Sequence, residues 1–198
     1  MTLEQLIETT KEFGVWLHFQ TNEKTHSSGV RGNTGIAILQ HSADVADAIV
    51  VLIESRLPGP AFSLARPLLE SYVRAFWLLH HATNGQIEAF NSGKCPNFPR
   101  LLAAIPNTPE TGGAWIHTMI DKNLKAFHDL THGGMEHVRR RISAGVIEPT
   151  YPEKEQKNLI KVTNEIRIFV GAELLSRLND EKGMRMLSTR AKVLRKLS

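Results

Sequence analysis

The stretch from Phe127 to Gly134, FHDLTHGG, carries side chains that could do chemistry. His128 and His132 stand four residues apart, so in a helix they lie on one face, one turn from each other. Imidazoles ionise near neutral pH and can exchange protons, hold a metal ion or contact the carbonyl groups that end a helix. The sequence therefore leaves three roles open for this pair: catalysis, metal binding and helix capping.

A second polar constellation lies in the apolar stretch LARPLLESYVRAFWLLHH, residues 64–81. At about 100° per residue, one helical face collects a stripe of five side chains: Arg66, Glu70, Arg74, Trp77 and His81. One interpretation is a solvent-facing stripe with Arg–Glu pairs one turn apart. The apolar remaining faces and the tryptophan favour a central helix instead, on which a charged stripe must be paired internally or line a cavity.

The two constellations together supply what metal-independent cleavage of RNA requires. A base must deprotonate a 2′-hydroxyl, an acid must protonate the leaving oxygen, and a cation must stabilise the phosphate; histidine and arginine suit these tasks. The candidate catalytic residues are Arg66, Glu70, Arg74, His81, His128 and His132. The alternative is a non-catalytic helical module, in which these residues form a buried structural network and the function lies in partner contacts.

A metal site is the third hypothesis, because two histidines four residues apart on a helix are a usable ligand pair. The ligand set would be His128, His132, Glu70 and Asp129. The HExxH motif is absent, no second paired-ligand motif occurs, and nothing resembles a glycine-rich nucleotide loop. We therefore expect neither a metal ion nor another cofactor.

The elements that must position these residues are predicted to be helices. Thr2 and Gln5 fit a capping box that starts the first helix, and a further long helix is predicted over residues 152–179. No convincing alternating strand occurs, so the predicted fold is all-α, a single bundle of about six to eight helices. The third helix, residues 61–83, contains Pro67, which removes a backbone hydrogen bond and should kink the helix there.

Two further boundaries follow from the polar and basic segments. Residues 25–34 are rich in glycine and serine and are predicted to be a loop, with Asn33 or Thr34 capping the second helix. We expect one bundle domain over residues 1–181. A basic amphipathic helix over residues 182–198 should dock on that bundle or on a second subunit.

Composition limits the class of protein. The chain has 198 residues, of which 41% are hydrophobic and 22% charged, as in soluble domains. The longest uninterrupted apolar run, residues 48–53, is far shorter than a membrane span. The N-terminus has no apolar signal core, and Cys95 is the single cysteine. These features favour a cytoplasmic protein without a membrane partner.

The net charge of +4 is compatible with a polyanionic partner such as RNA. Basic residues gather after Glu181, and a short cluster stands at residues 139–141. The candidate nucleic-acid contacts are Arg139, Arg140, Arg190, Lys192, Arg195 and Lys196. The plainer interpretation of both segments is a solvated helix face.

The two motifs resemble those of a bacterial family of uncharacterised helical proteins. Its members carry an Arg-x-x-x-Glu pair, here Arg66 and Glu70, on one helix. A later aromatic-x-x-Leu-Ser/Thr motif runs into a histidine; its residues here are Phe127, Leu130, Thr131 and His132. The resemblance covers about residues 36–135. That family is similar in turn to the HEPN superfamily (higher eukaryotes and prokaryotes nucleotide-binding).

The resemblance to HEPN proteins implies a small helical bundle, often a homodimer. Many of these proteins are metal-independent ribonucleases in toxin–antitoxin and phage-defence systems, so an antitoxin or another protein partner is implied as well. HEPN ribonucleases carry an arginine followed after four to six residues by a histidine. The best match here is Arg74 with His80 or His81, and Ala75 stands where a polar residue usually follows the arginine.

Overall fold

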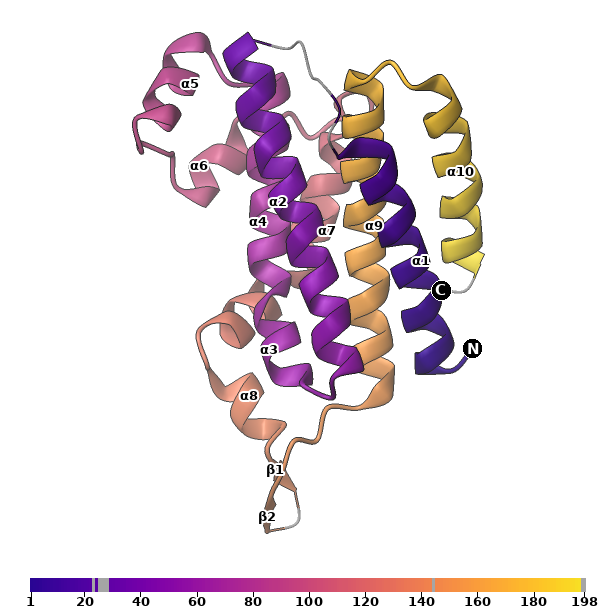
Figure 1. The fold of residues 1–198 in the computed structure, drawn as a ribbon. Coiled ribbons are helices and arrows are strands. Elements are labelled where there is room, and N and C mark those ends of the chain that lie inside the picture. The colour runs from indigo at the N-terminus through magenta and orange to yellow at the C-terminus, as the bar shows by residue number, and fades with distance from the viewer. Residues whose placement is uncertain (23, 25–28, 144, 197–198) are drawn as a thin grey trace.

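A computed structural model describes residues 1–22, 24, 29–143 and 145–196. Within these ranges the chain forms ten α-helices, one short 3₁₀ helix and a hairpin of two-residue strands (Figure 1). The elements are α1 Leu3–Thr21, α2 Gly29–Glu54, α3 Pro58–Ser63, α4 Ala65–His80, α5 Asn84–Asn91, α6 Phe98–Ala103, η1 Pro109–Thr111, α7 Gly113–Thr131, α8 Met135–Arg139, β1 Ile142–Ser143, β2 Val146–Ile147, α9 Glu153–Arg177 and α10 Glu181–Lys196. The predicted all-α fold is confirmed, and the extra helices are short ones of five to eight residues.

The bundle is built around α2, α4 and α9, with α7 against α4 and with α1 and α10 on the far side of α9 (Figure 1). Gly35 allows α2 and α4 to approach, since a Cβ atom there would lie 2.3 Å from the Leu79 side chain. α2 is long and apolar enough to cross a membrane by length and composition, and 44% of its most apolar window is buried in the bundle. Buried core helices meet the same criteria.

The first residues of α1 and α2 can be compared with two predicted helix boundaries. The capping box is confirmed, because the Thr2 hydroxyl accepts from the backbone N–H of Gln5 and the Gln5 side chain accepts from that of Thr2. The second helix begins at Gly29, earlier than the predicted caps at Asn33 and Thr34. Both of those residues lie inside α2; residues 25–28 of the predicted loop lie outside the described residues.

The chain has two helices where the sequence predicts one helix kinked at Pro67. α3 ends at Ser63, and Leu64 connects it to α4. Pro67 lies in the first turn of α4, where that helix itself contains no carbonyl partner for a backbone N–H. The Ser63 carbonyl, which a non-proline residue 67 could have bonded, accepts instead from Oγ1 of Thr131 at 3.3 Å. The proline break therefore creates an attachment point for the end of α7.

The basic C-terminal helix, α10, packs on α9 and α1 of its own chain. Its buried apolar stripe consists of Leu187, Ala191 and Leu194, as the sequence pattern indicates. These residues join a second hydrophobic cluster with Phe13, Trp16, Leu17, Ile168 and Leu175. Met184, at the same helical spacing, is 37% exposed, and Leu197, which continues the pattern, lies outside the described residues.

Candidate functional site

Arg66 joins the two sequence motifs in space. Its Nε donates to Oε1 of Glu70 at 2.6 Å, its Nη1 contacts Nδ1 of His128, and the same Nη1 lies 3.4 Å from Nε2 of His132. The imidazole rings of His128 and His132 have centroids 4.7 Å apart. We call Arg66, Glu70, His128 and His132 the Arg66 cluster; these four of the six candidate catalytic residues come together.

The local helices explain the spacing within each half of the cluster. Arg66 and Glu70 stand one turn apart in the first half of α4. His128 lies in the last turn of α7, and His132 is the C-cap of that helix, with its backbone N–H bonded to the carbonyl of His128 at 3.2 Å. Each pair is therefore fixed by helical geometry, whereas the meeting of the two pairs requires tertiary contacts.

Contacts at the break between α3 and α4 hold the end of α7. The Ser63 hydroxyl donates to the carbonyl of Leu130 at 3.0 Å, and Thr131 donates to the Ser63 carbonyl. Nε2 of His137 donates to the same Leu130 carbonyl at 2.5 Å, and its Nδ1 lies 2.6 Å from the Tyr151 hydroxyl. His137 and its neighbours thus hold the end of α7 that carries the imidazoles of the cluster.

The cluster is open to solvent on its histidine side. Each imidazole turns one ring nitrogen toward the Arg66 guanidinium, Nδ1 of His128 and Nε2 of His132. A guanidinium group can only donate, so these contacts suit ring nitrogens that accept. Both imidazoles are exposed, and the side chains of Arg66 and Glu70 are 21% and 22% exposed. A ligand can therefore reach both imidazoles and the guanidinium.

Arg74 and His81 lie apart from the cluster. No hydrogen bond or ion pair joins either one to it among the residues that the structure describes. His81 is the C-cap of α4, its Nε2 is buried without a partner, and burial followed by the charge of His80 lowers its pKa. The predicted stripe on α4 is thus divided between Glu70 and Arg74, and Trp77 in its second part is buried in the core.

The structure does not assemble the predicted metal ligands. Oδ2 of Asp129 accepts the backbone N–H of Glu136 at 2.5 Å and so caps α8, while Glu70 is bonded to Arg66. No three histidine, cysteine or acidic side chains within the described ranges stand close enough to share an ion. Asp129 faces α8 rather than the histidines, so the four predicted ligands do not come together in the structure.

The basic residues near α8 are partly paired. Arg140 is only 18% exposed and donates to both Glu136 and Glu155, at 2.5 and 2.8 Å. Arg139 is 69% exposed and donates to Glu136 at 3.0 Å. Of these two candidate nucleic-acid contacts, Arg139 is free to reach a partner, whereas Arg140 ties α8 to α9.

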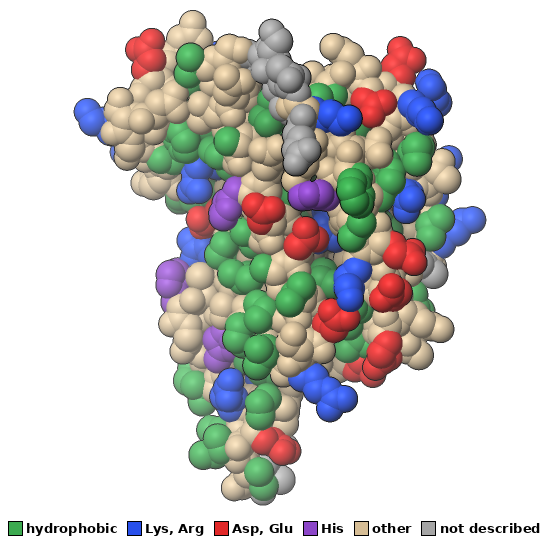
Figure 2. Space-filling model, in the orientation of Figure 1, with side chains coloured by type: hydrophobic (Ala, Val, Ile, Leu, Met, Phe, Trp, Pro, Cys, Tyr) green, Lys and Arg blue, Asp and Glu red, His purple; other side chains and the backbone are tan. Residues whose placement is uncertain are grey.

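The candidate contacts on α10 are divided in the same way. Arg195 makes a bidentate pair with Glu165, with both distances 2.8 Å, and the Arg190 guanidinium lies 5.0 Å from the ring centroid of Trp16. The remaining candidates are exposed: Lys192 and Lys196. On the face drawn in Figure 2, blue and red side chains are interspersed among the coloured residues and form no continuous basic strip.

Sequence reasoning missed a buried polar network between α1, α2 and α9. Arg167, 1% exposed, donates to Oδ1 of Asp47 at 2.5 Å and to the carbonyl of Thr10 at 3.1 Å. Asn164 donates to the Thr10 hydroxyl at 2.9 Å. A signal was present, because Arg167 stands at helical spacing within the buried series of α9 that includes Ile160.

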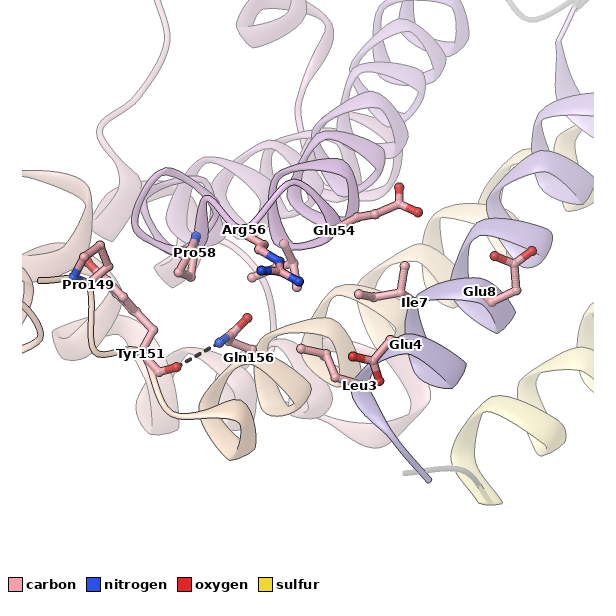
Figure 3. Close-up of a pocket in the computed structure, with 11 residues that line it drawn as sticks. Leu3, Glu4, Ile7, Glu8, Glu54, Arg56, Pro58, Pro149, Tyr151 and Gln156 are labelled. Carbon is pink, nitrogen blue, oxygen red and sulfur yellow. Dashed lines mark hydrogen bonds between the residues drawn. The ribbon is translucent and has the colours of Figure 1, made fainter.

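A cavity of about 580 Å³ was also not predicted. It lies between the start of α1, the end of α2 and the start of α9 (Figure 3). Arg56 lies in it, with the carboxylates of Glu4, Glu8 and Glu54 to one side and an apolar floor that includes Ile7. No sequence motif indicates this cavity, because its lining residues come from separate elements of the chain.

Comparison with known proteins gives a family and no function. A search of curated proteins and a search of solved structures found no match. The model of DUF6988, a family of unknown function, matches residues 39–193. That range contains the whole Arg66 cluster and most of the chain. The protein therefore belongs to the DUF6988 family of unknown function.

Proposed function

We propose that this protein binds RNA and cleaves it without a metal ion at the Arg66 cluster. The observation that carries the proposal is one guanidinium, held by Glu70, that reaches two exposed imidazoles on another helix. A HEPN-like identity, a homodimer, a cytoplasmic location and a role in defence or beside an antitoxin belong to the same proposal. They are supported by the resemblance of the two motifs.

The cluster has the groups that such a reaction needs. The 2′-hydroxyl attacks the adjacent phosphorus while one imidazole accepts its proton, and the other imidazole, protonated, gives a proton to the departing 5′ oxygen. The products are a cyclic phosphate and a free 5′-hydroxyl. Arg66 stabilises the charge on the phosphorus oxygens. A bound phosphate favours protonation of a neighbouring imidazole, which prepares the acid.

The rival function is a non-catalytic interaction module in which the cluster clamps α7 to α4. The specific observation in its favour is that Arg66 bonds to both helices beside the contacts between Ser63 and Leu130. In that case replacement of His132 by alanine would lower the free energy of unfolding by about 0.5–1.5 kcal/mol, because the partly buried guanidinium of Arg66 loses one of its contacts.

The experiment that separates these functions is incubation of the purified protein with total RNA, with and without EDTA. We expect cleavage in both, and loss of cleavage in His128→Ala and His132→Ala at an unchanged melting temperature. His41→Ala is the matched control, since His41 is an exposed histidine on α2 outside the cluster. Absence of cleavage by the wild type under both conditions refutes the ribonuclease proposal. Cleavage that EDTA abolishes indicates a metal site instead.

RNA binding has its own test through the exposed charges of α10. Each phosphate contact that is lost should reduce the slope of log binding constant against log salt by about one. We expect the double variant Lys192→Gln with Lys196→Gln to weaken RNA binding at low salt and flatten this slope, with cleavage chemistry unchanged. Arg190 and Arg195 are left intact because they hold α10 on the bundle. An unchanged slope would mean that α10 does not contact RNA.

A further inference from the structure

A separate cavity lies away from the Arg66 cluster, beside the start of α7. It has a volume of about 420 Å³ and lies between the C-terminal end of α4, the 3₁₀ helix η1 and the middle of α9. No residue of the Arg66 cluster lines it. Cavities of 300–1,000 Å³ with an apolar lining and a few polar groups are the usual form of small-molecule sites.

The floor of this cavity is aromatic. Tyr72 and Phe76 are 2% and 5% exposed, and Phe169 is half-buried beside them. Trp115 supports this floor, with its ring centroid 4.1 Å from that of Phe169 and 5.9 Å from that of Tyr72. Aromatic side chains packed against each other in this way present a rigid apolar surface, on which a flat ring can stack.

The polar groups around the floor are mostly hydrogen-bond acceptors. Glu173 and Glu110 bring two carboxylates, and Nε2 of His80 lies 3.0 Å from both oxygens of Glu173. The Nε2 atom of His81 is buried and has no partner among the described residues. A buried nitrogen without a partner lacks a hydrogen bond that a ligand can supply.

From this combination we propose that the cavity binds a flat aromatic ring that carries N–H donors, such as an amidine or an amino-substituted heterocycle. The ring stacks on Phe76 and Phe169, and its N–H groups bond to the carboxylates of Glu110 and Glu173. His81 accepts one further N–H. Carboxylates at the rim attract a cationic or donor-bearing ring and repel an anionic one, so charge decides which rings enter.

The state of His81 agrees with this role. Burial, and then the charge of His80, lowers the pKa of His81, so the imidazole is neutral at neutral pH and keeps a lone pair for a donor. Burial and then Glu173 raise the pKa of Tyr72, so its hydroxyl stays protonated beside the carboxylate. The residues that line the cavity include no arginine or lysine, and Arg177, outside the lining, has its Nε 4.0 Å from Oε2 of Glu173.

The test uses benzamidine as the probe, titrated into the full chain and followed by calorimetry and by backbone amide shifts. Benzoate is the matched probe, with the same ring and the opposite charge. We expect saturable benzamidine binding at least about tenfold tighter than that of benzoate, because benzamidine makes charge-assisted hydrogen bonds to the carboxylates that benzoate cannot make. Equal affinity for the two probes, or no saturation with benzamidine, would overturn the proposal.

Variants locate the binding. Ala172 lines the cavity, so Ala172→Phe should fill it and abolish benzamidine binding. Glu110→Gln changes an exposed carboxylate and should weaken binding by about tenfold, as for one lost charge-assisted hydrogen bond. Glu88→Gln, an exposed glutamate on α5, is the control and should bind as the wild type does. Melting curves check that each variant is folded.

The result with Glu110→Gln decides the question if Ala172→Phe fails to fold. Unchanged benzamidine affinity in Glu110→Gln would place the probe elsewhere and overturn the proposal. The outcome is independent of RNA cleavage: His128→Ala should keep its affinity for benzamidine, and cleavage can fail while this cavity still binds its ring.

Discussion

Arg56 ends α2 in a backbone conformation that usually belongs to glycine. Its φ is 60°, and the backbone N–H groups of Leu57 and Arg56 bond to the carbonyls of Leu52 and Ile53 at 2.8 and 3.0 Å. This pair of bonds defines a Schellman motif, in which the left-handed position favours glycine. An arginine there brings its Cβ close to the following carbonyl, at a cost of about 1–2 kcal/mol.

Arg56→Gly should therefore stabilise the protein. The substitution relieves that strain, while the greater freedom of glycine in the unfolded chain costs about 0.5–1 kcal/mol. The guanidinium of Arg56 makes no hydrogen bond or ion pair with any described residue. Its attraction to the carboxylates of Glu4, Glu8 and Glu54 in the same cavity is screened by solvent, so the loss of the side chain offsets only part of the gain. The net expectation is a gain of about 0.5–1 kcal/mol, or a melting temperature higher by about 1–4 °C for a chain of this length.

Urea and thermal denaturation measure this gain. Asn179 occupies the corresponding position after α9 with φ 53°, and asparagine tolerates this conformation, so Asn179→Gly should gain less. Ser55, one residue before Arg56, has no positive φ, and Ser55→Gly should not stabilise. A melting temperature for Arg56→Gly at or below that of the wild type would refute the strain argument.

Three further substitutions test contacts that hold the bundle. Asp47→Asn should lower the free energy of unfolding, measured by urea titration, by about 1–3 kcal/mol. The loss is smaller than for a fully buried pair, because Arg167 is buried but Asp47 is 51% exposed. Asp44→Asn is the control and should leave the free energy of unfolding unchanged. Burial, and then the neighbouring histidine, lowers the pKa of His81 from 6.5, so the unfolded chain binds more protons and stability falls as pH falls below this value. His81→Gln should therefore lose less stability than the wild type between pH 7 and pH 5. Thr131→Val leaves the carbonyl at the α3 break without its donor and should cost about 0.5–1.5 kcal/mol, measured by thermal melts.

The helices were predictable because capping residues and apolar spacing can be recognised within short segments of the sequence. The capping box of Thr2 and the apolar spacing of α9 depend on residues three or four apart. The start of α2 was not predictable in this way. Gly32 lies in the predicted loop and Gly35 directly follows the predicted cap, yet both are buried in α2, and Gly35 lies against Leu79 of α4. Tertiary packing outweighs the low helix propensity of glycine there.

The candidate site was also predictable only in its local spacing and not in its tertiary contacts. The prediction that Arg66 and Glu70 share a face, and that His128 and His132 share another, needed only helical geometry. That the histidine end of α7 lies beside Arg66 depends on how two distant helices pack, which no local pattern records. Asp129 shows the same limit, since its capping bond to Glu136 appears only once α8 has turned back on α7.

Pro67 connects the two sequence motifs, the Arg66–Glu70 pair on α4 and the histidine motif at the end of α7. Pro67 has no N–H for the carbonyl of Ser63, so that carbonyl is free to accept from Thr131. Thr131 stands between His128 and His132 in the chain, and its hydroxyl lies 2.7 Å from the Phe127 carbonyl and 3.3 Å from that of Ser63. Together with the bond from the Ser63 hydroxyl to Leu130, this contact holds the end of α7 beside Arg66, one residue before the proline. The proline and the histidine motif are therefore parts of one arrangement: with an N–H at position 67, the Ser63 carbonyl could have bonded within the helix instead of to the end of α7.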